Sequence, residues 1–319
     1  MLTPERQISF QTISGHLVFS VAEGKAILQG YEGRDMHLQI PAVLEDGSDR
    51  FPVEKIGPKA FFDNRYLKAV TIPAGVKSVG DWAFSHCPQL SRINMEEGPC
   101  ALGKNLFDQD RKFRIFYLGS PEGDGGERKD TEDADREGYG GLLAACATVL
   151  DAPYLLQTTR ENDTEWLARW DQRMLTILDS DDMEGYTEVV LCGEEDYGSS
   201  ENRPDEYRQK KRWRKVRLCF LRLLYDKKLA DANKIRLQDY LRSHTKGCES
   251  QETWLFLKNE RSQDMEYLKL FTELGCVGRD NFDACIADLS GEHAQMMAYL
   301  LSWKTDHLPD EDPFDSFSL

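Results

Sequence analysis

A repeat with a period of 23 residues constrains the first third of this chain more than any other feature. The copies begin at Ile56, Val79 and Leu102. Five positions keep their residue class through all three copies: Ile56, Val79 and Leu102; Gly57, Gly80 and Gly103; Phe61, Phe84 and Phe107; Leu67, Leu90 and Phe113; and Val70, Ile93 and Phe116. One such unit is too short to enclose a core by itself, so the copies are expected to stack on one another.

Stacking predicts a solenoid in which each coil holds a short strand, a turn at the glycine and a short helical or irregular return. Each phenylalanine then lies on its counterpart in the next coil, which forms a continuous column of buried side chains. In the strands, Leu67, Val70 and Ile72 are expected to point inward. Our predicted binding residues are those expected to face outward: Lys68, Thr71, Arg92, Asn94 and Tyr117.

The order of these motifs, IG-x-x-AF followed by C-P-x-L and I-x-x-x-I-P, resembles the BspA-type leucine-rich repeats of bacteria. The match is specific in Ile56–Glu96 and extends over residues 8–118. The resemblance implies a leucine-rich repeat fold, which we expect to be a right-handed β-solenoid with short helical turns. Proteins of this family are often surface adhesins of host-associated bacteria. The third copy loses its alanine and its Ile-Pro pair, which predicts either the end of the solenoid or docking of this copy on another element.

Residues 119–138 are acidic and glycine-rich, with eight Asp or Glu and no large apolar residue. Such a segment buries too little apolar surface to order itself, so it predicts a linker. The expected domains are a leucine-rich repeat domain over residues 1–118, this acidic linker, an α-helical domain over residues 139–305 and an acidic tail over residues 306–319.

After Tyr139 the spacing of apolar residues changes from a period of two to a period of 3.6, which is typical of helices. The predicted helices cover 141–156, 163–178, 206–229, 234–243, 250–259, 263–274, 281–289 and 292–304, and a short strand is expected at Val189–Leu191. The glycines after the last helices indicate helix pairs, and Gly275–Lys304 resembles the helix pair of an ankyrin-type repeat without its Thr-Pro-Leu-His start. The predicted fold class is therefore α+β and multidomain, a short leucine-rich repeat solenoid followed by a mainly α-helical domain.

A strongly basic stretch runs from Arg203 to Lys246, with fifteen Lys or Arg against five Asp or Glu. The candidate anion-binding residues on the helix at 208–222 are Lys211, Arg214, Lys215 and Arg222. One interpretation is a patch for nucleic acid, phospholipid headgroups or an acidic partner. The other, which we favour, is a face that is solvated or paired with acidic segments of the same chain.

Charge and motifs narrow the functional classes. The net charge of −16 disfavours attraction to nucleic acid or anionic membranes. Eight cysteines and six histidines show no disulfide framework and no complete metal-ligand spacing, so no metal and no cofactor is predicted. No apolar run is long enough to cross a membrane, and the first residues lack the pattern of a signal peptide, so a cytoplasmic location is expected.

The leading prediction is a non-enzymatic protein-interaction or scaffolding module that binds a protein partner through its leucine-rich repeat surface. No nucleotide-binding, hydrolase, zinc-protease or kinase motif is present, so no catalytic residue is predicted. The alternative is a metal-dependent enzyme with an acidic site in the helical domain at Asp181, Asp182, Glu194 and Glu195. A third alternative is binding of nucleic acid or another anion through the basic helix at 208–222.

Overall fold

The computed structural model describes residues 6–96, 100–107, 113, 115–118, 130–158, 164–187 and 203–308. The chain divides into two compact units, Met1–Met174 and Leu175–Leu319. The first unit therefore continues past the predicted repeat domain and the predicted linker. Each unit is described by itself below.

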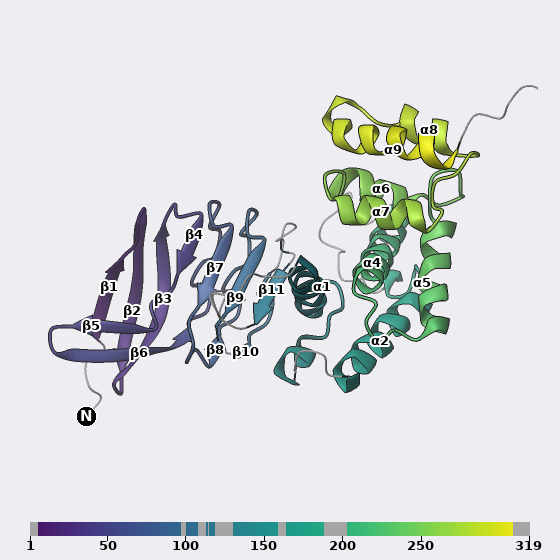
Figure 1. Ribbon diagram of the computed structural model, residues 1–319. Helices are drawn as coiled ribbons and strands as arrows, with labels where there is room; N and C mark the ends of the chain where they lie inside the picture. The colour runs from purple at the N-terminus through teal and green to yellow at the C-terminus, as the bar shows by residue number, and fades with distance from the viewer. Residues whose placement is uncertain are drawn as a thin grey trace, which may run out of the picture. The chain divides into compact units, whose positions relative to one another are not determined.

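The first unit begins with an antiparallel meander and continues as parallel coils (Figure 1). The strands of the larger sheet are β1 (Arg6–Gln11), β2 (Gly15–Ala22), β3 (Lys25–Gly33), β6 (Asp49–Ile56), β8 (Ser78–Val79) and β10 (Ala101–Leu102), in that spatial order, and β5 (Val43–Asp46) pairs with β6. The second sheet has the order β11 (Ile115–Leu118), β9 (Arg92–Met95), β7 (Ala69–Ile72), β4 (His37–Gln39), and all its pairings are parallel. Parallel pairing of strands that recur every 23 residues is the arrangement that stacked coils require.

A column of phenylalanine rings runs through the core of the coils. The rings of Phe61 and Phe84 stack with centroids 5.0 Å apart, and those of Phe84 and Phe107 stack at 6.0 Å. Tyr31 continues the column on the N-terminal side, with its ring centroid 5.9 Å from that of Phe61. The expected column of buried aromatic residues is therefore present, and it begins one coil earlier than the three copies found in the sequence.

The glycine of each coil allows the backbones of neighbouring coils to approach closely. A Cβ atom on Gly80 would lie 2.5 Å from the backbone nitrogen of Pro58, and one on Gly103 would lie 2.5 Å from the backbone nitrogen of Asp81. Real Cβ atoms do not tolerate such distances, so a side chain at either position would force the coils apart. This contact explains why glycine recurs in the sequence with the period of the repeat.

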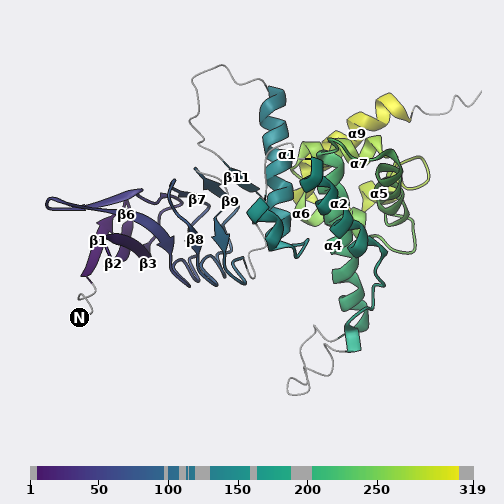
Figure 2. The same cartoon turned by 90° about the horizontal axis from the view of Figure 1, so that it is seen from below.

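Helix α1 (Asp130–Ala147) packs against β11, the last strand of the second sheet. Figure 2 shows β9 and β11 followed by α1. The helix begins inside the segment predicted as a linker, and its described buried residues, which include Tyr139, Leu142 and Leu143, lie after the acidic part. Residues 119–129 lie outside the described part of the chain.

The C-terminal part of α1 contacts the two helices that follow it along the chain, the 3-10 helix η1 (Pro153–Thr158) and α2 (Thr164–Asp179). The predicted helix at 141–156 is instead the end of α1 followed by η1, since proline cannot continue an α-helix. Helix α2 spans the division between the units, and its Trp170 donates from Nε1 to the backbone oxygen of Leu142 at 3.1 Å. Leu142 and Trp170 are both fully buried.

The second unit is helical in its described residues. After the end of α2, its helices are α4 (Pro204–Leu224), α5 (Asp231–Ser243), α6 (Glu252–Glu260), α7 (Met265–Glu273), α8 (Phe282–Ala287), η3 (Gly291–His293) and α9 (Ala294–His307). Helix α4 contacts α5, α6 and α7 and forms the centre of the unit (Figure 1). These positions agree with the predicted helices within a few residues, whereas the strand expected at Val189–Leu191 lies outside the described residues.

Candidate recognition groove

The second sheet of the first unit has one buried and one outward face. Leu38, Val70 and Ile93 are buried in register on the neighbouring strands β4, β7 and β9. The residues before and after them point to the opposite face, because side chains alternate along a strand. Two outward columns result: His37, Ala69 and Arg92, and, two residues further along each strand, Gln39, Thr71 and Asn94.

Hydrogen bonds between coils hold parts of this outward face in place. Asn94 donates from Nδ2 to the hydroxyl oxygen of Thr71 at 3.2 Å. The hydroxyl of Ser91 donates to the backbone oxygen of Lys68 at 3.1 Å. Each bond joins residues 23 positions apart, so the repeat period orders the polar surface as well as the core.

The turn between β1 and β2 forms a wall beside this face. Phe10, Thr12 and Ile13 from the end of β1 and the turn line the same cavity as the outward residues of β4, β7 and β9. The side chains of the wall are only partly covered: Phe10 is 38% exposed and Ile13 is 95% exposed. An isoleucine so open to solvent beside a cavity is an apolar surface available to a ligand.

Asp35 holds the turn in position. Its carboxylate accepts hydrogen bonds from the hydroxyl of Thr12, from the hydroxyl of Tyr31 at 2.7 Å and from the backbone nitrogen of Ser14 at 3.0 Å. Burial on its own would raise the pKa of Asp35, but the hydrogen bonds from Thr12, Tyr31 and Ser14 outweigh it, and the pKa is lowered. Burial and the neighbouring Asp35 raise the pKa of Tyr31 to about 12. The carboxylate is therefore ionised at neutral pH, and its charge is satisfied inside the protein.

The cavity between the turn and the sheet has a volume of about 740 Å³. Four of the five predicted binding residues line it: Lys68, Thr71, Arg92 and Asn94. The fifth, Tyr117, lies opposite Asn94 in the parallel pairing of β11 with β9. Its side chain is outside the described part of the chain. We refer to this cavity as the groove.

The charge of the groove is positive. Lys68 and Arg92 are exposed and supply two cations, and the imidazole ring of His37 lies beside them. Asp35 is the one acid among the described residues that line the groove, and its oxygens are occupied by hydrogen bonds from the turn and from Tyr31. This sign is opposite to the net charge of −16 of the whole chain.

The residues that line the groove without having been predicted from the sequence include Phe10, Ile13, His37 and Gln39. A signal for the last two was present, because Ile40-Pro41 stands in the place of Ile72-Pro73 and makes Gln39 the counterpart of Thr71. No local pattern marked Phe10 or Ile13, since they reach the groove only through the turn that Asp35 holds.

The basic helix of the second unit does not present the four predicted anion-binding residues as one solvent-facing patch. Lys215 is buried, and its Nζ donates to the carboxylate of Asp182 at 2.7 Å and to the backbone oxygen of Ser180 at 2.6 Å. Arg222 is fully buried and donates to the backbone oxygens of Tyr225 and Lys227. Oxygen acceptors within the chain therefore hold both cations.

The other two candidates on this helix are half-buried. Lys211 lies with Nζ 5.2 Å from the ring centroid of Tyr207, and Arg214 is partly covered by the unit. The cations on the inner side of this helix, Lys215 and Arg222, are buried and donate to oxygen acceptors.

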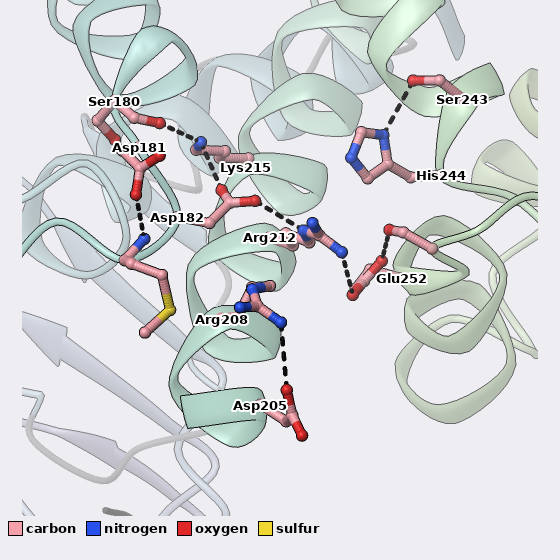
Figure 3. A network of polar contacts seen from close by, with 12 residues as sticks. Ser180, Asp181, Asp182, Asp205, Arg208, Arg212, Lys215, Ser243, His244 and Glu252 are labelled. Atoms are coloured by element: carbon pink, nitrogen blue, oxygen red, sulfur yellow. Dashed lines mark hydrogen bonds and ion pairs between the residues drawn. The ribbon is translucent and has the colours of Figure 1, made fainter. Parts of the chain in front are cut away.

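The acidic alternative depends on four residues, of which two are described. Asp182 accepts from Lys215 and from Arg212 Nε, both at 2.7 Å, and Arg212 also lies 3.7 Å from Glu252 (Figure 3). Burial would raise the pKa of Asp182, but hydrogen bonds from Lys215 and Arg212 lower it. No group of three metal-ligating side chains occurs in the described ranges, and Glu194 and Glu195 lie outside them.

Stacked parallel coils, a column of aromatic residues and glycines at the points of close approach define the repeat-bearing part of the first unit as a solenoid. Residues 50–121 match a family described as "BspA type Leucine rich repeat region (6 copies)", so this stretch of the chain is a BspA-type leucine-rich repeat region. The resemblance predicted from the motifs is confirmed there.

Solved structures of bacterial proteins show similarity over about a third of the chain. A leucine rich cell surface protein from Faecalibacterium prausnitzii is 25% identical, with 36% of this chain and 31% of that chain covered and a TM-score of 0.30. A leucine-rich repeat protein from Bacteroides capillosus is 24% identical, with 35% of this chain and 99% of that chain covered and a TM-score of 0.27. A leucine-rich repeat protein from T. pallidum is 20% identical, with 32% of this chain and 57% of that chain covered and a TM-score of 0.26. The matched region thus spans about a third of the first of these proteins. No curated protein matches the chain.

Among the described residues, no helix combines the length and the apolar composition needed to cross a membrane.

Proposed function

We propose that the first unit is a protein-recognition module and that its binding site is the groove. The observation that carries the proposal is that four residues chosen from the sequence as outward-facing, Lys68, Thr71, Arg92 and Asn94, line one cavity. Tyr117 lies opposite Asn94 on the neighbouring strand β11, and we propose it as a further contact at the edge of the site.

The construction of the groove supports recognition of a protein segment. Its floor is a rigid parallel sheet, so outward side chains are held at fixed spacings of about 4.8 Å between strands. Its wall adds apolar surface at Phe10 and Ile13, and its floor adds hydrogen-bonding groups at Thr71 and Asn94. A mixture of apolar surface and fixed polar groups is the usual composition of protein-binding sites.

The proposed activity is non-enzymatic. Lys68, Arg92, Thr71 and Asn94 offer charge and hydrogen bonds, and they contain neither a nucleophile with an adjacent base nor a paired acid and base. The family match over residues 50–121 supports an interaction role for the repeat surface.

Site-specific photo-crosslinking tests the proposal. A photo-reactive amino acid replaces Thr71 in the groove or, as the control, Lys55 on strand β6 of the other sheet, in the full-length chain. Both proteins are incubated with an extract of the cells that make the chain, and crosslinked products are identified by mass spectrometry. We expect a protein that crosslinks at Thr71 but not at Lys55, and that is lost when Arg92→Glu is added. Equal crosslinking at both positions, or none at Thr71, would contradict the assignment of the groove.

A further inference from the structure

We propose that an extended segment of another protein binds in the groove as an added strand at the open edge of β4. This inference rests on the proposed function and adds the mode of recognition. Three observations carry it: a strand position that the second sheet leaves open, the backbone groups that β4 directs toward that position, and the apolar side chains beside it.

The first observation is that the larger sheet extends past the second sheet at the N-terminal end of the solenoid. Each coil leads from a strand of the larger sheet to a strand of the second sheet: β3 to β4, β6 to β7, β8 to β9 and β10 to β11. Strands β1 and β2 lie beyond β3, and the described part of the chain places no strand beyond β4 (Figure 1). The position beside β4 is therefore an open sheet edge.

The β5–β6 hairpin contacts the start of β1. Arg6 pairs there with Asp46 and Asp49, and its guanidinium carbon lies 5.8 Å from the ring centroid of Phe51. At the other end of β1, Phe10 is 38% exposed and lines the groove. The open part of the sheet edge therefore coincides with the groove.

The second observation concerns the backbone of β4. On the side of β7, the backbone oxygen of Met36 accepts from the nitrogen of Ala69 at 3.1 Å, and the nitrogen of Ile40 donates to the oxygen of Thr71 at 3.0 Å. Backbone groups of alternate residues point to the same side of a strand, so Leu38 also faces β7. The residues between these three must then direct their backbone groups the other way.

His37 and Gln39 are the residues whose N–H and C=O groups point away from β7. No described strand pairs with β4 on that side. Both residues are exposed and line the groove. Open strand edges bind extended chains through hydrogen bonds of the backbone, and contacts with alternate side chains provide specificity. His37 and Gln39 thus offer two donors and two acceptors to a segment that lies in the groove.

The third observation is the apolar surface beside this edge. Phe10 lies opposite the fully buried Leu17 in the pairing of β1 with β2, so both side chains are on the core side of the larger sheet. Leu38 points inward from β4 and also lines the groove. The groove therefore continues from the outer face of β4 to its edge. A strand added there directs alternate side chains toward Phe10, and Ile13, which is 95% exposed, lies in the same wall.

The size of this edge favours a short segment of another protein over a second copy of this chain. Strand β4 has three residues, and the groove of about 740 Å³ has room for a few residues. A stable interface between two folded proteins buries about 800 Å² on each partner. The partner is therefore an extended segment that carries an apolar residue facing Phe10, and self-association becomes an outcome that the test must distinguish.

The test is selection of short random peptides displayed on phage against the immobilised full-length protein, followed by fluorescence anisotropy with the selected peptides. Gln39→Pro removes the outward N–H, while the bonds of Leu38 and Ile40 to β7 remain, because proline is tolerated on the open side of an edge strand. Gln39→Ala is the matched control, since it removes the side chain but keeps the N–H. We expect Gln39→Pro to weaken binding about tenfold or more and Gln39→Ala to change it by about threefold or less.

Methylation of single amide nitrogens in a selected peptide tests the same contact without altering the protein, and it decides the matter if Gln39→Pro does not fold. We expect losses of about tenfold or more at every second amide only, because a strand bonds to one neighbour with alternate residues. Phe10→Ser should also weaken binding about tenfold or more. Its control is Phe62→Ser, since Phe62 is 41% exposed and does not line the groove.

The outcomes separate the two proposals. Losses without alternation along the peptide, or unchanged binding by a folded Gln39→Pro, would overturn strand addition, and the recognition groove would stand if those peptides still required Thr71. No peptide that depends on the groove, together with no crosslink at Thr71, would overturn both proposals. Dimers of the original chain in analytical ultracentrifugation that are lost with Gln39→Pro would replace the segment of another protein by a second copy and overturn the inference.

Discussion

The ring of Phe84 lies parallel to the ring of Phe61, with the centroids 5.0 Å apart and the planes within 3° of each other. The two residues are 23 positions apart, and both are about 1% exposed. Phe84 also stacks on Phe107 in the following coil. Each coil therefore depends on its neighbours for the packing of its own central residue.

Removing the middle ring of this column is expected to destabilise the first unit strongly. Phe84→Ala leaves a cavity between two rings and should cost about 3–5 kcal/mol of the unfolding free energy. Urea unfolding followed by circular dichroism measures the loss. The control is Phe62→Ala, because Phe62 is 41% exposed and its removal should cost about 1 kcal/mol or less. Similar losses for the two variants would mean that the column does not hold the coils together.

The hydrogen bond from Tyr31 to Asp35 is expected to make stability depend on pH. The pKa of Asp35 is lowered in the folded chain, so its contribution is complete above the unfolded pKa of about 3.9 and is lost as pH falls through the folded pKa. Tyr31→Phe removes the donor to the carboxylate and should cost about 1–3 kcal/mol at neutral pH. The cost should shrink in acid, where Asp35 is protonated.

Thermal unfolding of both proteins at several pH values between neutral and strongly acidic conditions checks this prediction. Tyr66→Phe serves as the control, since Tyr66 is 45% exposed and its change should alter stability little at any pH. A cost of Tyr31→Phe that stays constant across the range would show that the ionised carboxylate is not what Tyr31 stabilises.

The ion pairs of Asp182 are expected to stabilise the second unit. Asp182→Asn leaves the ammonium of Lys215, which is 5% exposed at its side chain, without its carboxylate partner (Figure 3). Loss of one partner of a buried pair typically costs about 3–5 kcal/mol. Chemical unfolding of Asp182→Asn measures the cost, and the exposed Asp205, 92% open at its side chain, provides the control Asp205→Asn. If both variants unfold at the same denaturant concentration as the original chain, the buried pair contributes nothing.

The lowered pKa of Asp182 predicts how this stabilisation changes with pH. Because the pKa is lowered in the folded state, the contribution of Asp182 is present above its unfolded pKa and is lost as the pH falls through its folded pKa. The difference in stability between the original chain and Asp182→Asn should therefore decrease in acid.

The sequence predicted the repeat-bearing part of the fold because the constraint is local and periodic. A spacing of 23 residues brings Phe61 to Phe84 and Val70 to Ile93 once the coils stack, and both relationships are present. The helices of the second unit were predicted for a similar reason, since a period of 3.6 marks the buried side of a helix.

Prediction was weaker where a partner comes from a distant part of the chain. The acidic composition near Asp130 indicated a linker, yet a helix that contacts β11 begins there. Lys215 was a candidate for anion binding or for pairing within the chain, but its sequence neighbours did not identify its partner Asp182, 33 residues away. Neither relationship has a signature in the residues next to it.

The period of the coils, the inward columns and the outward positions of Thr71, Arg92 and Asn94 follow from the sequence, because alternation along a strand needs only local order. Lys68 precedes strand β7, and contacts between distant segments bring all four residues together in a groove. The wall at Phe10 and Ile13 exists because Asp35, 23 residues beyond Thr12, accepts hydrogen bonds from the turn and holds it there. A site made by such a long-range contact depends on the folded position of both segments and has no local pattern.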